Sequence, residues 1–418
     1  MSLRCLILFL FTFVFVSADN WPAWRGPLGT GVCLEKNLPT KWSRTKNVKW
    51  KVPLSERGNS SPVVWGGKVF VTQAIEKEGR RALLCLDRRN GKVLWQRGLV
   101  YQKNELTHRT NPQCSASPVT DGVRVVVSHA SAGLACYDMD GKELWRRRLA
   151  EQKHIWGNGA SPVIYKDLVI LNHGPGEPTF LVALDKKTGT RVWRHDEPGA
   201  DSGVKKEGER GRWVGSWTTP IVVEVKGKDQ LLMSYPGRVA AFDPLVGKEL
   251  WTCRGLNPLV YTSPLYEDGI VVAMGGYRGT ALATRVGERG DVTSTHRLWT
   301  RPKEHQRIGS GVIHNGHVYI LNEQGVAQCI GLRSGKVMWE ERLRGKGARG
   351  GSWSSMVLAD GRLYAINQSA DTFVLRAAPK FELLETNSLA ETTQSSIAVS
   401  DGDLFIRTYN HLWCIGTK

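Results

Sequence analysis

The chain has 418 residues, of which 41% are hydrophobic and 23% charged, and this composition excludes disorder, collagen and coiled coil as its main organisation. The length suits two or three ordinary domains or one large repeat architecture. The formal net charge is +18. The basic residues are spread along the chain and are densest at 146–148 and 342–349, so we expect solvated outer strands rather than a nucleic-acid site.

The first eighteen residues have the features of a secretory signal. One arginine, Arg4, precedes an unbroken apolar run from Cys5 to Val16, and Ser17-Ala18 supplies small residues for cleavage. We therefore predict a signal peptide over residues 1–18. A run of this length is too short to span a bilayer, and no cysteine stands at the cleavage point for a lipobox. These features predict an exported protein of the periplasm or extracellular space that is soluble and does not span a membrane.

One phrase recurs along the remaining chain, about every 48 residues. It opens with a small hydroxyl residue, usually before proline, and it closes with an apolar residue followed by tryptophan. The openings stand at Ser61, Ser117, Ser161, Thr219, Ser263, Ser310, Ser355 and Ser396. The closing tryptophans, which we call the structural Trp slot, are Trp50, Trp95, Trp145, Trp193, Trp251, Trp299 and Trp339.

Within each phrase the apolar residues alternate, as in β-strands. The first phrase predicts strand A over 61–65, strand B over 68–73, strand C over 82–87 and strand D over 93–97, joined by Gly-containing turns. Four antiparallel strands repeated around an axis make a blade of a β-propeller. Eight openings therefore predict an all-β, eight-bladed β-propeller over residues 46–418, preceded by an N-terminal extended arm over 19–45.

The last repeat has room for three strands only. Residues 47–52 have the closing pattern but no blade in front of them. We expect this N-terminal strand to pair with residues 412–415 and to close the last blade, because closure removes two exposed sheet edges. The Trp- and Pro-rich segment 20–27 is expected to cover the propeller wall.

The phrase Leu86-Asp87…Gly91-Lys92-Val93-Leu94-Trp95 resembles the pyrroloquinoline-quinone (PQQ)-type propeller repeat. The resemblance covers about residues 42–418 and implies that each slot tryptophan packs against the turn of the next blade. Two groups share this repeat. Quinoprotein dehydrogenases hold PQQ and Ca²⁺ in the central funnel, whereas outer-membrane assembly propellers of the BamB type bind partner proteins and perform no chemistry.

Cysteine usage favours a structural role. Four cysteines occupy one position near the end of strand C: Cys85, Cys136, Cys329 and Cys414. Alanine takes that position in other repeats, so we predict buried free thiols there. A bridge among Cys33, Cys114 and Cys253 stays open. The sequence has no zinc pattern, no nucleophile elbow and no adjacent cysteines of the kind that alcohol-oxidising quinoproteins carry.

The connections from strand D of one blade to strand A of the next, which we call the D–A loops, carry the more informative residues. Strand A is innermost, so residues just before each opening must ring the central channel. Insertions at 98–115 and 194–217 fall on this same face, and such insertions often mark a binding face. The candidate contacts are Arg109, Asn111, Trp156, Asn158, Trp217, Tyr261, Arg307 and Trp353. The alternative is that these tryptophans only plug the channel neck.

The resemblance and the loops together predict a monomeric binding or scaffold protein of the cell envelope, without catalytic residues or a metal site. Its partner would be a protein or an anionic envelope glycan at the channel mouth, and no cofactor is expected. The alternative is a PQQ-dependent oxidoreductase with PQQ and Ca²⁺ in the funnel. Fold alone does not decide between the two.

Overall fold

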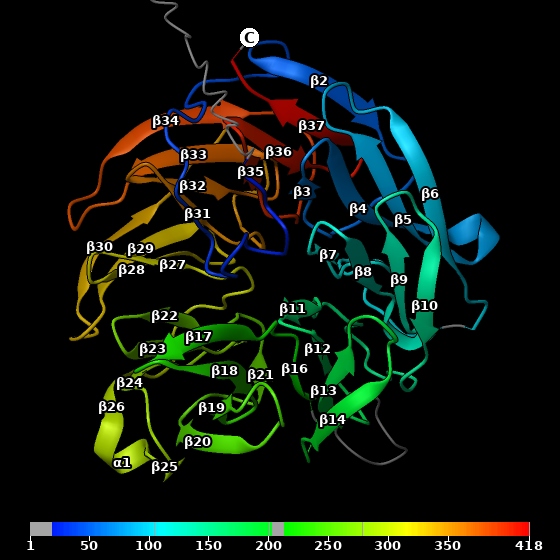
Figure 1. Ribbon diagram of the computed structural model, residues 1–418. Coiled ribbons are helices and arrows are strands. Elements are labelled where there is room, and N and C mark those ends of the chain that lie inside the picture. The colour runs from blue at the N-terminus through cyan, green and yellow to red at the C-terminus, as the bar shows by residue number, and fades with distance from the viewer. Residues whose placement is uncertain (1–18, 104, 200, 203–212, 278, 418) are drawn as a thin grey trace, which may run out of the picture.

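The computed structural model describes residues 19–103, 105–199, 201–202, 213–277 and 279–417. The predicted signal peptide lies outside these residues. Eight antiparallel blades of four strands surround a central channel (Figure 1), so the predicted all-β, eight-bladed propeller is confirmed. The one α-helix of the described residues is the short α1, Thr293–His296, and within those residues no helix has the length and hydrophobicity to cross a bilayer.

The four strands of each blade follow one another in the chain, except in blade 5, where β25 intervenes, and in the last blade. Blades 1 to 4 contain, in order, β3 (Val63–Trp65), β4 (Lys68–Ile75), β5 (Arg80–Asp87), β6 (Val93–Val100); β7 (Val119–Thr120), β8 (Arg124–Ser128), β9 (Leu134–Asp138), β10 (Glu143–Arg147); β11 (Val163–Tyr165), β12 (Leu168–His173), β13 (Phe180–Asp185), β14 (Arg191–Asp196); and β17 (Ile221–Val225), β18 (Lys228–Tyr235), β19 (Arg238–Phe242), β20 (Glu249–Arg254).

Blades 5 to 8 follow the same plan. They contain β22 (Leu265–Glu267), β23 (Ile270–Met274), β24 (Ala281–Arg285), β26 (Arg297–Arg301); β27 (Val312–His314), β28 (His317–Leu321), β29 (Val326–Gly331), β30 (Val337–Arg342); β31 (Val357–Ala359), β32 (Arg362–Ile366), β33 (Asp371–Arg376), β34 (Leu383–Ser388); and β35 (Ala398–Ser400), β36 (Asp403–Arg407), β37 (His411–Ile415), β2 (Val48–Pro53). A further strand, β25 (Gly290–Asp291), adds to the outer edge of blade 4 in parallel with β20.

The ring closes as predicted. Strand β2 pairs antiparallel with β37, with Val48 opposite Ile415 and Val52 opposite Leu412. Blade 8 therefore takes its outermost strand from the N-terminal part of the chain and its other three from the C-terminal part. Figure 1 shows the blue β2 lying beside the red β37. This pairing covers the edge that each segment would otherwise expose.

The opening residues of the repeat form a closed circle of hydrogen bonds. Ser61 N–H donates to the Oγ of Ser117 at 2.8 Å, Ser117 N–H donates to the Oγ of Ser161 at 3.0 Å, and the pattern continues from blade to blade. The remaining acceptors, in order, are Thr219, Ser263, Ser310, Ser355, Ser396 and Ser61. These residues are all buried. The repeated hydroxyl thus satisfies a backbone donor of the preceding blade.

The structural Trp slot joins the outer parts of the blades. The indole N–H of Trp95 donates to the carbonyl of Met139 in the next blade at 3.1 Å, and five other slot tryptophans donate to equivalent turn carbonyls. Trp251 differs and donates to Gln230 Oε1. The turn glycines have no side chain, which leaves room for the ring: a Cβ on Gly141 would lie 2.7 Å from Trp95.

The strand-C position that holds cysteine or alanine lies directly opposite a slot tryptophan, which explains why its residues are small. Cys85 is the cross-strand partner of Trp95 and Ala183 is that of Trp193. The other slot tryptophans also face cysteine or alanine: Cys136, Ala241, Ala283, Cys329 and Cys414. The prediction of buried free thiols is confirmed, and Cys33, Cys114 and Cys253 are free and buried as well.

The N-terminal arm occupies the channel. Trp21 exchanges two 2.9 Å backbone hydrogen bonds with Val64 of β3, and Thr120 of β7 donates to the carbonyl of Pro22. Strand β1 (Val32–Cys33) then pairs in parallel with β31 of blade 7. Figure 1 shows this blue segment between β3 and β31. Residues 20–27 therefore lie against the innermost strands rather than on the wall, because their apolar side chains, led by Trp21 at 1% exposure, fill the channel.

Candidate functional site

The described residues enclose a cavity of about 450 Å³ at the channel mouth, which we call the cup. Every one of the eight D–A loops contributes to its wall, including the connection from β2 to β3. The floor includes Trp24 of the N-terminal arm. The lining residues are Trp24, Asn59, Ser61, Thr110, Asn111, Ser115, Ser117, Trp156, Gly159, Ser161, Trp213, Trp217, Leu259, Tyr261, Tyr277, Gln306, Ile308, Trp353, Gln394 and Ser396.

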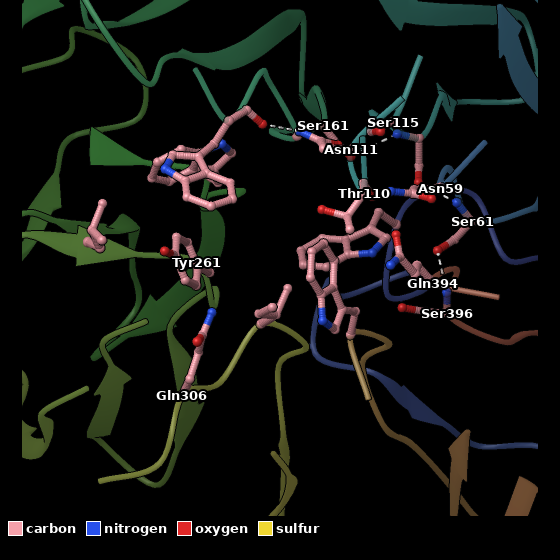
Figure 2. A pocket seen from close by; sticks show the side chains of 18 of the residues that line it. Asn59, Ser61, Thr110, Asn111, Ser115, Ser161, Tyr261, Gln306, Gln394 and Ser396 are labelled. Carbon is pink, nitrogen blue, oxygen red and sulfur yellow. Dashed lines mark hydrogen bonds between the residues drawn. The ribbon is translucent and has the colours of Figure 1, made fainter. Parts of the chain in front are cut away.

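Five of the eight sequence-predicted contacts line the cup: Asn111, Trp156, Trp217, Tyr261 and Trp353. Figure 2 shows Tyr261 and Gln306 on one side of the cavity and Thr110, Asn59 and Gln394 across from them.

The other three predicted contacts do not line the cup. Arg109 is exposed outside it. Asn158 donates its amide N–H to the carbonyl of Gly174 at 2.5 Å. The Arg307 side chain is fully buried, and it donates to Glu304 at 2.6 Å and to Gln328 at 2.9 Å. Burial is the main cause that lowers the pKa of Arg307, against the opposing attraction of Glu304. The Arg307 guanidinium therefore supports the loop from within.

Hydrogen bonds between adjacent loops position the cup wall. The amide nitrogen of Asn111 donates to the carbonyls of Trp156, at 2.7 Å, and Asn158, at 3.0 Å. The indole N–H of Trp217 donates to the carbonyl of Gly157 at 2.8 Å. Three consecutive D–A loops are thus held in one arrangement. Because its amide N–H groups serve the backbone, Asn111 positions Trp156.

The loop that carries Asn111 is anchored below the cup. Glu105 pairs with Arg81 of β5, and it accepts the backbone N–H of Ser131 at 3.0 Å. Both members of the pair are almost fully buried, at 6% and 5% side-chain exposure. Removing one partner of such a pair would leave the other as an unpaired buried charge. This ion pair fixes the long D–A loop between β6 and β7 to blades 1 and 2.

Aromatic side chains of the cup pack edge against face. The ring centroids of Trp217 and Tyr261 lie 5.1 Å apart at 72°, and those of Trp156 and Trp213 lie 6.4 Å apart at 83°. His108 packs on Trp156 at 4.5 Å. At the rim, Trp213 is 45% exposed and Tyr277 is 47% exposed. The cup thus offers rigid aromatic surfaces both inside and at its mouth.

Two of these D–A loops also pair as strands. Strand β16 (Trp213–Ser216) runs parallel to β21 (Leu259–Val260) and antiparallel to β15 (Asp201–Ser202). This small sheet carries Trp213 and Leu259 into the cup wall. This sheet belongs to the insertion that the sequence places over 194–217, of which residues 200 and 203–212 lie outside the described residues.

The described wall of the cup carries no formal charge. None of the described residues that line it is charged. Burial raises the pKa of the Tyr261 phenol, so the phenol stays protonated at neutral pH. Burial lowers the pKa of His108 behind Trp156, an effect that Arg109 reinforces, so that imidazole is neutral as well.

Several lining residues were missed from the sequence. Trp24 belongs to the segment expected to cover the propeller wall, and nothing in its local pattern indicates the channel. Asn59, Gln306 and Gln394 each precede an opening residue by two to four positions. This spacing, applied evenly to all eight repeats, would have found them. Tyr277 comes from the β23–β24 connection, which is not a D–A loop and carries no sequence signal for the cup.

The lining residues do not fit PQQ with Ca²⁺. Calcium takes six to eight oxygen ligands, several of them carboxylates, and PQQ carries carboxylates that call for cationic partners. The described residues contain no group of three or more His, Cys, Asp or Glu that could hold a metal ion. The described cup wall has neither a carboxylate nor a cation.

Curated proteins of two kinds resemble this chain in sequence. The outer membrane protein assembly factor BamB of Moranella endobia is 25% identical over 313 residues, which cover 74% of this chain and 62% of the relative. The 1-butanol dehydrogenase (quinone) of Thauera butanivorans is 25% identical over 270 residues, 59% of this chain and 39% of the relative. The chain therefore spans less than two thirds of the length of these relatives.

Solved structures of the same two kinds share the fold. BamB from Moraxella catarrhalis superimposes with a TM-score of 0.61 at 15% identity, over 88% of this chain and 96% of that one. The quinohemoprotein alcohol dehydrogenase from Comamonas testosteroni gives a TM-score of 0.68 at 14% identity, over 96% and 81%. A sequence family described as "Outer membrane protein assembly factor BamB" matches residues 35–113, 79–341 and 204–418. The chain thus belongs to this family of PQQ-like β-propellers.

Proposed function

We propose that this protein is a non-enzymatic binding protein of the cell envelope that holds its ligand or partner in the cup of the D–A face. One observation carries the proposal: all eight D–A loops converge on a cavity whose described wall is aromatic and polar but uncharged. Rigid aromatic residues with a few polar groups are typical of binding sites. The proposed envelope location is supported by the predicted signal peptide and by the similarity to outer membrane protein assembly factors.

The quinoprotein alternative is supported by the sequence similarity to the 1-butanol dehydrogenase (quinone) of Thauera butanivorans and by the fold shared with the quinohemoprotein alcohol dehydrogenase. It is disfavoured by the lining of the cup, which offers PQQ no ion-pair partner and Ca²⁺ no carboxylate among the described residues. The binding role needs no charged or nucleophilic side chain in the cup.

Titration of the purified protein with PQQ in the presence of Ca²⁺, followed by calorimetry and absorbance, tests the choice. We expect no saturable binding. Saturable PQQ binding that Trp353→Ala abolishes would overturn the proposal. In parallel, native mass spectrometry of protein isolated from envelope extracts should show bound material that is lost in Trp353→Ala. The control is Trp65→Ala, because Trp65 packs on Gly122 in the turns of the opposite face.

A further inference from the structure

We propose that the ligand of the cup is an uncharged oligosaccharide, bound by stacking of its sugar rings on the tryptophans and by hydrogen bonds from its hydroxyl groups. This inference rests on the proposed binding function and adds the chemical class of the ligand. It differs from the anionic glycan expected from net charge, because it follows from the wall of the cup rather than from the whole chain.

The described wall of the cup disfavours charged ligands. An anionic ligand inside the cup would lose water without gaining a cationic partner, because no described lining residue is Lys or Arg. A cationic ligand would find no carboxylate there, and it would approach a protein of net charge +18. The remaining class is a neutral ligand.

The aromatic content then selects ligands with flat apolar faces. Five tryptophans line the cup, at positions 24, 156, 213, 217 and 353. Trp213 is 45% exposed at the rim, although apolar surface of this size is usually buried. A pyranose ring presents C–H groups on its faces and hydroxyls around its edge. It can therefore cover an indole ring while its edge stays available for hydrogen bonds.

Unsatisfied polar atoms of the lining side chains call for a ligand that both donates and accepts. The indole nitrogens of Trp156 and Trp353 are donors without a partner among the described residues. The amide oxygens of Asn59 and Gln394 are acceptors that likewise have no hydrogen-bond partner among the described residues. Gln394 is only 8% exposed, so its unpaired oxygen is costly. These four atoms have almost no solvent-accessible surface, so a ligand reaches them only after the side chains rotate towards the cup. A sugar hydroxyl can then serve either kind of atom, because it donates one hydrogen bond and accepts others.

These donors and acceptors together distinguish a glycan from another occupant of aromatic grooves, a run of consecutive prolines. Proline offers carbonyl acceptors but no N–H. It could therefore serve the two indole donors and would leave Asn59 and Gln394 unpaired. The hydroxyls of Thr110 and Ser115 also line the wall (Figure 2), but they already bond to His108 Nδ1 and to the carbonyl of Pro112.

The test is a titration of the purified protein with neutral hexasaccharides of glucose, mannose and xylose, followed by tryptophan fluorescence and calorimetry. We expect saturation by at least one of them, with an affinity that does not change between about 50 mM and about 500 mM NaCl, because salt screens only interactions between charges. Trp353→Ala should weaken binding by about thirtyfold or more. Trp65→Ala on the opposite face should bind as the parent protein does.

Comparison ligands make the outcome decisive. If none of the neutral hexasaccharides saturates the signal at millimolar concentration, or if only a heparin fragment or decaproline does, the inference is wrong. Should Trp353→Ala fail to fold, as judged by circular dichroism, Gln394→Leu tests the same site without removing a ring. Binding of heparin or decaproline that requires Trp353 would keep the proposed binding function, whereas PQQ binding in the cup would overturn both.

Discussion

The backbone N–H of Ser396 donates to the Oγ of Ser61 across 3.0 Å, and this hydrogen bond joins the eighth blade to the first. The two residues are 335 positions apart in the chain. The same bond links each of the other seven neighbouring blade pairs, from Ser61 and Ser117 onward. The circle therefore fixes the spacing of the innermost strands, from which the D–A loops project into the cup.

Loss of one hydroxyl from this circle should destabilise the protein. In Ser61→Ala the buried N–H of Ser396 loses its acceptor, which costs about 1–3 kcal/mol of unfolding free energy. The matched control is Ser61→Thr, because Thr219 already takes this role for Ser161. Urea unfolding of the two variants should show a clear loss of unfolding free energy for Ser61→Ala and a smaller change for Ser61→Thr. Equal loss in both would show that shape, rather than the hydroxyl, matters.

The eight openings were visible in the sequence because a propeller repeats its contacts along with its residues. The degenerate openings at Ser310, Ser355 and Ser396 kept the hydroxyl even where the proline was lost. The partner of each hydroxyl was not visible, since the period gives equivalent positions but not the contacts between neighbouring blades. The contact between Cys85 and Trp95 was not visible in the sequence either. The two residues are cross-strand partners, which explains why only a small residue occurs opposite a slot tryptophan.

Substitutions at Cys85 test that register. Cys85→Ala should cost about 1 kcal/mol or less, because alanine already faces Trp193 in the equivalent position. Cys85→Leu should cost about 1–3 kcal/mol, because the larger side chain must displace Trp95 in a fully packed core. Thermal unfolding of both variants measures the difference. A larger loss for alanine than for leucine would contradict the explanation.

Thiol chemistry gives a separate check on the same position. Burial raises the pKa of Cys85 and of Cys136 to about 12, so neither thiol ionises near neutral pH. Reaction with a thiol reagent requires the thiolate. We expect labelling of both only after unfolding in denaturant, as followed by mass spectrometry. Rapid labelling of the folded protein would show that the slot is open to solvent.

Two buried histidines should make stability depend on pH. Burial lowers the pKa of His129 to about 3, and that of His173 to about 3 as well, from the ordinary 6.5. Their neutral forms favour folding above pH 6.5, and this contribution is lost as the pH falls from 6.5 towards 3, because the unfolded chain takes up the protons. Each histidine then contributes a slope of up to about 1.4 kcal/mol per pH unit.

Urea unfolding at pH 7.5 and pH 5.0 measures this effect in a range where most carboxylates stay ionised. The protein should be less stable at pH 5.0. The double variant His129→Gln, His173→Gln should show a smaller difference between the two pH values, whatever its stability at pH 7.5. An undiminished difference would assign the pH dependence to other groups.

The N-terminal arm should contribute strongly to stability through Trp21. This side chain is 1% exposed in the channel, and its removal in Trp21→Ala should cost about 3–5 kcal/mol. Leu34 on the same arm is 88% exposed, so Leu34→Ala should change the unfolding free energy by no more than about 0.5 kcal/mol. Denaturant unfolding compares them. Similar small effects would mean that the arm is dispensable for the ring.

The site was predictable in part for the same reason as the fold. D–A loop residues close to an opening must lie near the channel, and Trp156, Trp217 and Trp353 do so. Arg307 lies equally close to an opening, but its side chain turns away from the cup to form a buried ion pair with Glu304. Within the described residues the other repeats do not have this pair, so the repeat pattern does not predict it. Trp24 reached the cup by a path through the channel, which no local pattern indicates.

The union of β2 with β37 has a consequence for how the protein is made. A ribosome produces the chain from its N-terminus, so residues 48–53 emerge long before their partners at 411–415. Strand β2 must remain unpaired while seven blades are synthesised. The arm that precedes it contacts both β3 and β31, and it cannot complete these contacts until β31 has been synthesised. Contacts this distant in sequence form slowly, and an unpaired strand edge is prone to aggregate meanwhile. Completion of the ring is therefore a late step of folding, which waits for the synthesis of the eighth blade.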